Sequence, residues 1–526
     1  MGTLYGHLER GRREPLGEPA YTDLRQALDT VQFFAQELAA KDCSIARLRA
    51  LLFGPKTEKS SAICGNKEQS DQAGATSGTP PFPRKKPRAK APGHGRNGVG
   101  KFPGARRVKV ALEGRQSGDP CPDCGGKVYL EKEPHTLIRF LAVAPIQATV
   151  YEMERWRCTC CAKVHTAPTP EGVGEEKYDA SVPALLGELR YGVGLPHPRI
   201  AALQNAFGIP LPPSTQWQLL LAASGLLLPA HAELVRQAAQ GHLFHIDDTR
   251  MKILNKATLA PDKDDRKAIQ TTGILAHIGS RRIALFITGM NHAGENLEAV
   301  LKHRAEGLSQ PIQMADALAA NMAGEDGDLD TILAHCLVHA RRKFVEIAKD
   351  FPAEVRILLK FLRLIYRLEG RTTAGKLDPA ARLAYHQRRS KPIMDKLEVW
   401  LQRLFDDRLV EPNSELGRAI KYMRNHWTEL TLFLREPGAP LDNSAAERLV
   451  KRAIIHRKNS LFYRTQQGAR VGDTFMSLIH TAELNGVESF DYLVALLRNA
   501  EAVAKEPGRW MPWNYLRPDP VGAKSS

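Results

Sequence analysis

The order of apolar segments after residue 240 most constrains the fold of this chain. Three β-rich segments occupy residues 243–247, 272–278 and 282–287, a helical pattern covers 293–303, and a short apolar segment at 311–314 follows. Several strands interrupted by one helix are typical of an α/β domain. The sequence therefore predicts an α/β core over residues 239–485.

A long helical region interrupts this core. From residue 333 to about 434 the apolar residues recur with helical period and basic residues lie between them. We therefore expect a helical insertion at about 345–435. A helical tail is predicted over 486–526.

The charge of the chain points to a polyanionic partner. Its 526 residues carry a net charge of +16, while 43% of residues are hydrophobic, an ordinary fraction for a globular protein. A strongly basic balance favours nucleic acid as the partner. No apolar run approaches the roughly 20 residues that span a bilayer, and no signal peptide is evident. We expect a cytoplasmic, nucleoid-associated protein without a membrane partner.

The N-terminal region predicts a helix and then a linker. Apolar residues recur every seven positions at Leu24, Val31, Leu38, Ile45 and Leu52, which favours a coiled coil over residues 20–60. Asp42 and Arg49 interrupt the seam, so a helix packed on its own domain is the alternative. Residues 61–110 are rich in Gly, Pro, Ser and basic side chains, a composition typical of a disordered linker that also contacts DNA phosphates.

Four cysteines have the spacing of a structural zinc site. Cys121 and Cys124 form one Cys-x2-Cys pair, and Cys158 and Cys161 form a second. Two such pairs supply the four thiolates of a tetrahedral zinc site. The sequence predicts a small β-rich zinc-binding domain at 111–170, with strands near 138–150. Residues 175–238 then predict helices, either a DNA-reading helix-turn-helix or a helical hairpin packed on the core.

Three isolated acids are candidate metal ligands. Asp247, Asp316 and Glu447 each lie on a different predicted element. Each also has a structural explanation, since Asp247 could begin a turn, Asp316 could cap a helix, and Glu447 has the capping-box spacing after Ser444. Spacing alone therefore leaves both readings open. His335 and His339 likewise fit either helix packing or a second metal site.

An ordered set of motifs resembles bacterial insertion-sequence transposases of the IS-sixty-six type. The motifs are residues 245–249, 313–316, 336–344 and 442–462, with a continuation at 481–487. This resemblance implies a DDE-type transposase with an RNase H-like catalytic core. Asp247, Asp316 and Glu447 would be its catalytic acids and would bind Mg²⁺ or Mn²⁺. Asp248, Ala317, Leu318, Ser444 and Ser460 depart from the usual residues of that family.

The resemblance also implies partners and a reaction. The protein would hydrolyse phosphodiesters at the element ends and transfer each 3′-hydroxyl into target DNA. Its partners would be double-stranded DNA (terminal repeats and target), further copies in a homodimer or higher oligomer, and two small accessory proteins. Basic side chains expected to hold DNA phosphates are Arg341, Arg342, Lys343, Arg448, Lys451, Arg457 and Lys458. A catalytically inactive zinc-dependent DNA-binding relative is the alternative.

Overall fold

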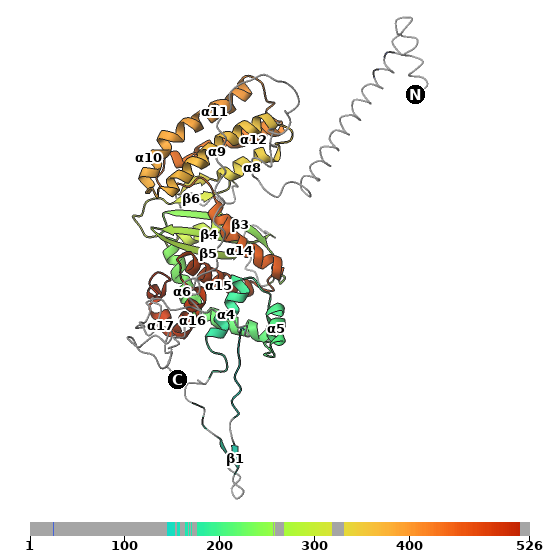
Figure 1. Cartoon of the computed structure of the whole chain (residues 1–526), viewed down its shortest axis with the longest axis vertical. Helices are drawn as coiled ribbons and strands as arrows, with labels where there is room; N and C mark the ends of the chain where they lie inside the picture. The colour runs from blue at the N-terminus through green and yellow to red at the C-terminus, as the bar shows by residue number, and fades with distance from the viewer. Residues whose placement is uncertain are drawn as a thin grey trace, which may run out of the picture. The chain divides into compact units, whose positions relative to one another are not determined.

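A computed structural model describes residues 145–152, 155–157, 164–166, 176–255, 268–317 and 331–515, together with a few isolated positions (Figure 1). The chain divides into two compact units. The first comprises Met1–Ser70, Glu171–Ala201 and Pro212–Ser526, and the second comprises Asp71–Pro170 and Ala202–Leu211. The predicted coiled coil, the linker and the four zinc-site cysteines lie outside the described residues.

A five-stranded mixed sheet is the centre of the first unit. Its spatial order is β5-β4-β3-β6-β7. The first three strands form an antiparallel meander, whereas β6 and β7 run parallel to β3. The prediction of an α/β fold is confirmed. The strands are β3 (Leu243–Met251), β4 (Ile269–Ile278), β5 (Arg281–Gly289), β6 (Ile312–Ala315) and β7 (Ile332–His335).

Strand β3 is longer than its apolar residues indicated. Its pairing with β4 continues through Asp247↔Gly273 as far as Met251↔Ile269. Asp247 therefore lies inside a strand, and the alternative that it begins a turn is wrong. Backbone hydrogen bonds to β4 keep the polar residues 247–250 extended, although their composition does not favour a strand.

Two helices cover opposite faces of β3 and β4. Helix α14 (Ser444–Ser460) packs on the face of Asp247, and α7 (Ala293–Leu301) packs on the other face. Gly273 permits the close approach of α14, because a Cβ at this position would lie 2.8 Å from Val450 Cγ2. A larger residue at 273 would push α14 away from the sheet.

Helix α15 (Gln466–Leu484) pairs with the free edge of β5. The Asp473 carboxylate, the Ser477 hydroxyl and the Thr481 hydroxyl accept the backbone N–H groups of Thr288, Phe286 and Ala284 at 2.8–3.0 Å. Four helical residues advance about 6.0 Å and two strand residues about 6.7 Å, so the two periods nearly match. The helix thereby satisfies every second N–H of an edge strand that would otherwise be open.

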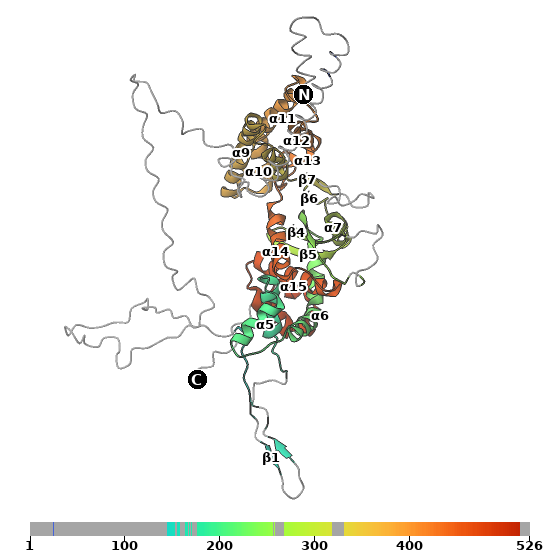
Figure 2. The same cartoon turned by 90° about the vertical axis from the view of Figure 1, so that its right-hand side faces the viewer.

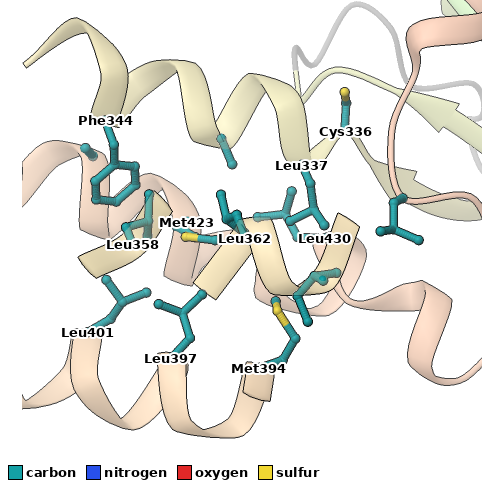
Figure 3. Close-up of a cluster of buried hydrophobic side chains, with 14 of the residues drawn as sticks. Cys336, Leu337, Phe344, Leu358, Leu362, Met394, Leu397, Leu401, Met423 and Leu430 are labelled. Atoms are coloured by element: carbon teal, nitrogen blue, oxygen red, sulfur yellow. The ribbon is translucent and has the colours of Figure 1, made fainter. Parts of the chain in front are cut away.

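A helical bundle between β7 and α14 has its own hydrophobic core. Leu337, Phe344, Leu358, Leu397 and Met423 are among its fully or almost fully buried residues (Figure 3). The bundle lies beside the β6–β7 side of the sheet in both views (Figures 1 and 2). Its elements are α8 (Leu337–Glu346), α9 (Pro352–Ala374), α10 (Pro379–Arg389), α11 (Lys391–Asp406), α12 (Glu415–Asn425), α13 (Trp427–Leu430) and the 3-10 turn η5 (Leu432–Leu434).

Most of the remaining described helices of the first unit pack on α6 or α15. Helix α6 is 26 residues long and apolar enough to cross a membrane by length and composition. Its residues Leu220, Leu227 and Leu234 are fully buried within the unit, whereas Leu226 and Leu228 are about half exposed, and 33% of its most apolar stretch is buried. The elements are α4 (Ser181–Gly187), the π-helical turn η2 (Glu188–Gly192), α5 (His197–Ala206), α6 (Pro213–Ala238), α16 (Ser489–Arg498), α17 (Ala500–Lys505) and η6 (Pro507–Trp510).

The described part of the second unit contains a short antiparallel strand pair. Strands β1 (Arg155–Arg157) and β2 (Val164–Thr166) pair through Trp156↔His165. Along the sequence they flank the second cysteine pair. Residues 145–150 are not a strand, so the β-rich prediction was wrong for that part of 138–150. The backbone of Ile146 instead bonds to a side chain: its N–H donates to the Gln204 Oε1, and its carbonyl accepts from the Gln204 Nε2.

Candidate active site

Asp247 and its neighbour Asp248 point to opposite faces of β3, as successive strand residues must. The Asp248 carboxylate accepts hydrogen bonds from the Thr272 hydroxyl at 2.6 Å and from the Ala293 N–H, at the start of α7, at 2.9 Å. Within the described residues, the Asp247 carboxylate accepts a hydrogen bond only from the Asp248 N–H, at 2.9 Å. Asp248 is thus bound to α7, whereas Asp247 faces α14.

Asp316 lies next to Asp247 because of strand register. Parallel strands β3 and β6 pair His245 with Met314, and each acid comes two residues after its member of that pair. Asp316 directly follows β6, so this register places it near Asp247, and its charge contributes to the raised pKa of Asp247. The sheet therefore supplies two of the three predicted acids.

Glu447 approaches Asp247 from the helix that covers this face of the sheet, and its charge acts on that acid. It lies in the first turn of α14, the helix that packs over Gly273, the register partner of Asp247. The helix N-cap is Asn443, without a side-chain capping bond, so the capping-box alternative for Glu447 is wrong. Glu447 Oε1 is buried and has no hydrogen-bond partner among the described residues.

Electrostatic coupling ties the three acids together. The pKa of Asp247 is raised from 3.8 to about 7, chiefly by burial and further by the charges of Asp316, Glu447 and Asp248. A carboxylate surrounded by others in a partly buried site retains its proton unless a cation compensates the charge. The donor set consists of hard oxygen atoms, and Glu447 keeps one oxygen unpaired. These residues fit a divalent ion such as Mg²⁺.

Asn443 connects the elements of the site. Its amide donates to the Ile246 carbonyl at 2.7 Å, and its Oδ1 lies 3.1 Å from His245 Nδ1. Its backbone N–H donates to Cys336 Sγ at 3.2 Å. One buried side chain therefore holds the start of α14 against β3. Sequence reasoning missed this role, because an asparagine before a helix reads as an ordinary N-cap.

The thiol of Cys336 also borders the site. Cys336, His339 and Glu447 place one potential ligand atom each within 4.8 Å of one another. Burial raises the pKa of the Cys336 thiol to about 11, so the sulfur is protonated and neutral near neutral pH. His335 lies in β7 and His339 in α8, so these histidines are not one helical turn apart as their spacing implied. They belong to different clusters.

The predicted DNA-binding residues divide into two groups. On α14, Arg448, Lys451 and Lys458 are exposed. Arg457 instead donates to the Thr249 hydroxyl at 3.0 Å and to the Arg250 carbonyl, so it holds α14 against β3. On α8, Arg341 and Arg342 are partly buried, and the Lys343 ammonium lies 5.4 Å from the Tyr422 ring centroid.

Comparison with known proteins identifies the chain. The family model described as "Transposase IS66 family" matches residues 176–471, which include the three acids and the helical bundle. The chain belongs to the IS66 transposase family.

Similar curated proteins come from Sinorhizobium fredii. The uncharacterized protein y4jD is 31% identical over 39% of this chain and 40% of its own length. The uncharacterized protein y4hP is 25% identical over 76% of this chain and 73% of its own length. The uncharacterized protein y4qI is 33% identical over 44% of this chain and 43% of its own length, so two of the three matches span less than half of the relative.

Substitution of Asp247 by asparagine is expected to change how stability depends on pH. The native state holds this proton more tightly than the unfolded chain, so wild-type protein loses unfolding free energy as pH rises from about 4 to 7. Asparagine carries no titrating proton. In EDTA, the stability of Asp247→Asn relative to wild type should therefore rise over this range, by up to about 4 kcal/mol. Urea unfolding at several pH values measures this difference, and a pH-independent difference would contradict the coupling.

Gly273→Ala is expected to disturb the site through packing. The added Cβ meets Val450, whose branched side chain has little freedom to move. We therefore expect the free energy of unfolding to fall by about 1–3 kcal/mol and Glu447 to be displaced. Gly289→Ala is the matched control, because a Cβ there has only Gln466 Nε2 near it, at 4.0 Å. Thermal unfolding of both variants measures the effect. Equal melting temperatures would show that α14 does not depend on this glycine.

Proposed function

We propose that this member of the IS66 family is an active DDE-type DNA transposase with an RNase H-like catalytic core. Asp247, Asp316 and Glu447 would be its acids. The observation that carries the proposal is the rise in the pKa of Asp247, to which the charges of Asp316 and Glu447 both contribute. The sheet order, an antiparallel meander followed by two parallel strands, supports the RNase H-like assignment.

The three acids would create a site of high negative charge beside bound DNA. When bound there, divalent metal ions activate the attacking oxygen and stabilise the leaving oxygen of the phosphodiester. Asp247 would present its carboxylate from β3, Asp316 would present its carboxylate from the end of the neighbouring β6, and Glu447 has an oxygen with no other described partner. Asn443 and Arg457 are positioning residues, because they hold α14 against β3 without being ligands.

The proposed reaction has two steps. In the first, water attacks a phosphorus at the element end, the P–O3′ bond breaks, and the element keeps a free 3′-hydroxyl. In the second, that hydroxyl attacks a phosphorus of target DNA and displaces a target 3′-oxygen, so one phosphodiester replaces another. The exposed Arg448, Lys451 and Lys458 would neutralise DNA phosphates along α14.

Other parts of the chain would serve DNA binding and assembly. We propose that Cys121, Cys124, Cys158 and Cys161 bind structural zinc, and that the N-terminal heptads pair copies of the chain. The proposed partners are double-stranded DNA, further copies of the chain and two small accessory proteins. We propose that the protein acts in the cytoplasm, at the nucleoid.

Cleavage of a duplex that carries the terminal repeat of the element tests the proposal. With Mn²⁺ or Mg²⁺, wild-type protein should release a 3′-hydroxyl end and join it to target DNA. Asp247→Asn should cleave about 10³-fold more slowly, a loss of about 4 kcal/mol of transition-state stabilisation. DNA binding should persist, since the phosphate contacts come from other residues.

The control is Asp395→Asn, which removes an exposed carboxylate that pairs with Lys391 on α11. It should cleave like wild type. Wild-type protein that binds the duplex but never nicks it would instead indicate a catalytically inactive DNA-binding relative. Cleavage without joined product would indicate a nuclease.

A further inference from the structure

We infer that His335, His426 and Glu429 form a divalent-metal site, distinct from the carboxylate site, and that zinc is the ion it prefers. These residues join the end of β7 to α12 and α13 of the helical bundle. One potential ligand atom from each lies within 4.8 Å of the other two. The site would fasten the bundle to the sheet.

Two polar atoms in this cluster have no other role in the described structure. Both His335 Nδ1 and Glu429 Oε2 are buried and have no hydrogen-bond partner among the described residues. His335 as a whole is only 4% exposed. Burying polar atoms without partners is unfavourable. A shared cation would satisfy both.

The donor set selects the metal. Two imidazoles and a carboxylate suit zinc, whereas Mg²⁺ prefers oxygen ligands alone. Zn–N and Zn–O bonds of about 2.0–2.2 Å place tetrahedral ligands roughly 3.4 Å apart. Small side-chain movements from the observed spacing would reach that geometry and leave one position for water.

Aromatic packing accounts for only part of the arrangement. The His335 and His426 rings meet edge to face with centroids 5.1 Å apart, and Tyr422 lies 5.0 Å from His426. These contacts use ring faces and edges. They leave the unpaired nitrogen of His335 and the unpaired oxygen of Glu429 unexplained.

The location gives the site a consequence for catalysis, which rests on the proposed function. His335 pairs in register with Ala315, the residue before Asp316. The charge of Asp316 also acts on His335, so the cluster is close to this acid. A metal here would fix Asp316 relative to the bundle while leaving Asp247 and Glu447 untouched.

Zinc content of the full chain tests the inference. Protein loaded with zinc and dialysed against zinc-free buffer containing excess Mg²⁺ is analysed by elemental mass spectrometry. Wild type and Asp247→Asn should hold about one zinc ion per chain more than Glu429→Gln or His426→Gln. The matched controls His303→Gln and Glu398→Gln, at exposed positions, should keep the wild-type content. Equal zinc in all these proteins would overturn the inference.

A second measurement avoids any loss of folding in the variants. X-ray absorption at the zinc edge of wild-type protein should show nitrogen and oxygen ligands in addition to any sulfur from the cysteine site. A spectrum with sulfur ligands alone would overturn the inference. Both results are independent of cleavage, so failure of the zinc site and failure of the proposed transposase activity are distinguishable.

Discussion

The close packing of α14 on the sheet is the contact on which the candidate site depends. Gly273 leaves room for Val450. Asn443, at the start of α14, and Arg457, in its last turn, form hydrogen bonds to β3. Strand register alone would bring Asp247 and Asp316 together. Only the helix brings Glu447, 131 positions further along the chain than Asp316, near enough for its charge to act on Asp247.

This arrangement is unfavourable without a cation. Burial and two neighbouring acids raise the pKa of Asp247 to about 7, so the folded protein stores repulsion that a divalent ion would relieve. The scaffold offsets that repulsion elsewhere. The side chains of Asp473, Ser477 and Thr481 close the β5 edge, and a separate apolar core stabilises the bundle.

The sequence predicted the α/β order and the approximate positions of β3, β4, β5, α7 and β6. It missed β7, because residues 333–335 were read as the start of the helical region, whereas they form a strand beside β6. Apolar segments located the strands, because buried strands must be apolar, but they ended β3 at Asp247 when the ladder continues to Met251. The grouping of the three acids came from resemblance to a family, since spacing cannot specify a contact across the 131 positions that separate Asp316 from Glu447. Asn443 and Gly273 gave no signal, because their roles arise from tertiary contacts. His335 and His339 misled for the same reason: a strand end and a helix start separate residues that look one helical turn apart.

A crystal structure of the protein soaked in Mn²⁺ would test the shared-ion claim most directly, because anomalous scattering locates manganese without assumptions about activity. We expect manganese bound at about 2.1 Å to carboxylate oxygens of Asp247, Asp316 and Glu447. If manganese bound elsewhere and none of these acids shared an ion, the three carboxylates would not be a metal-dependent active site.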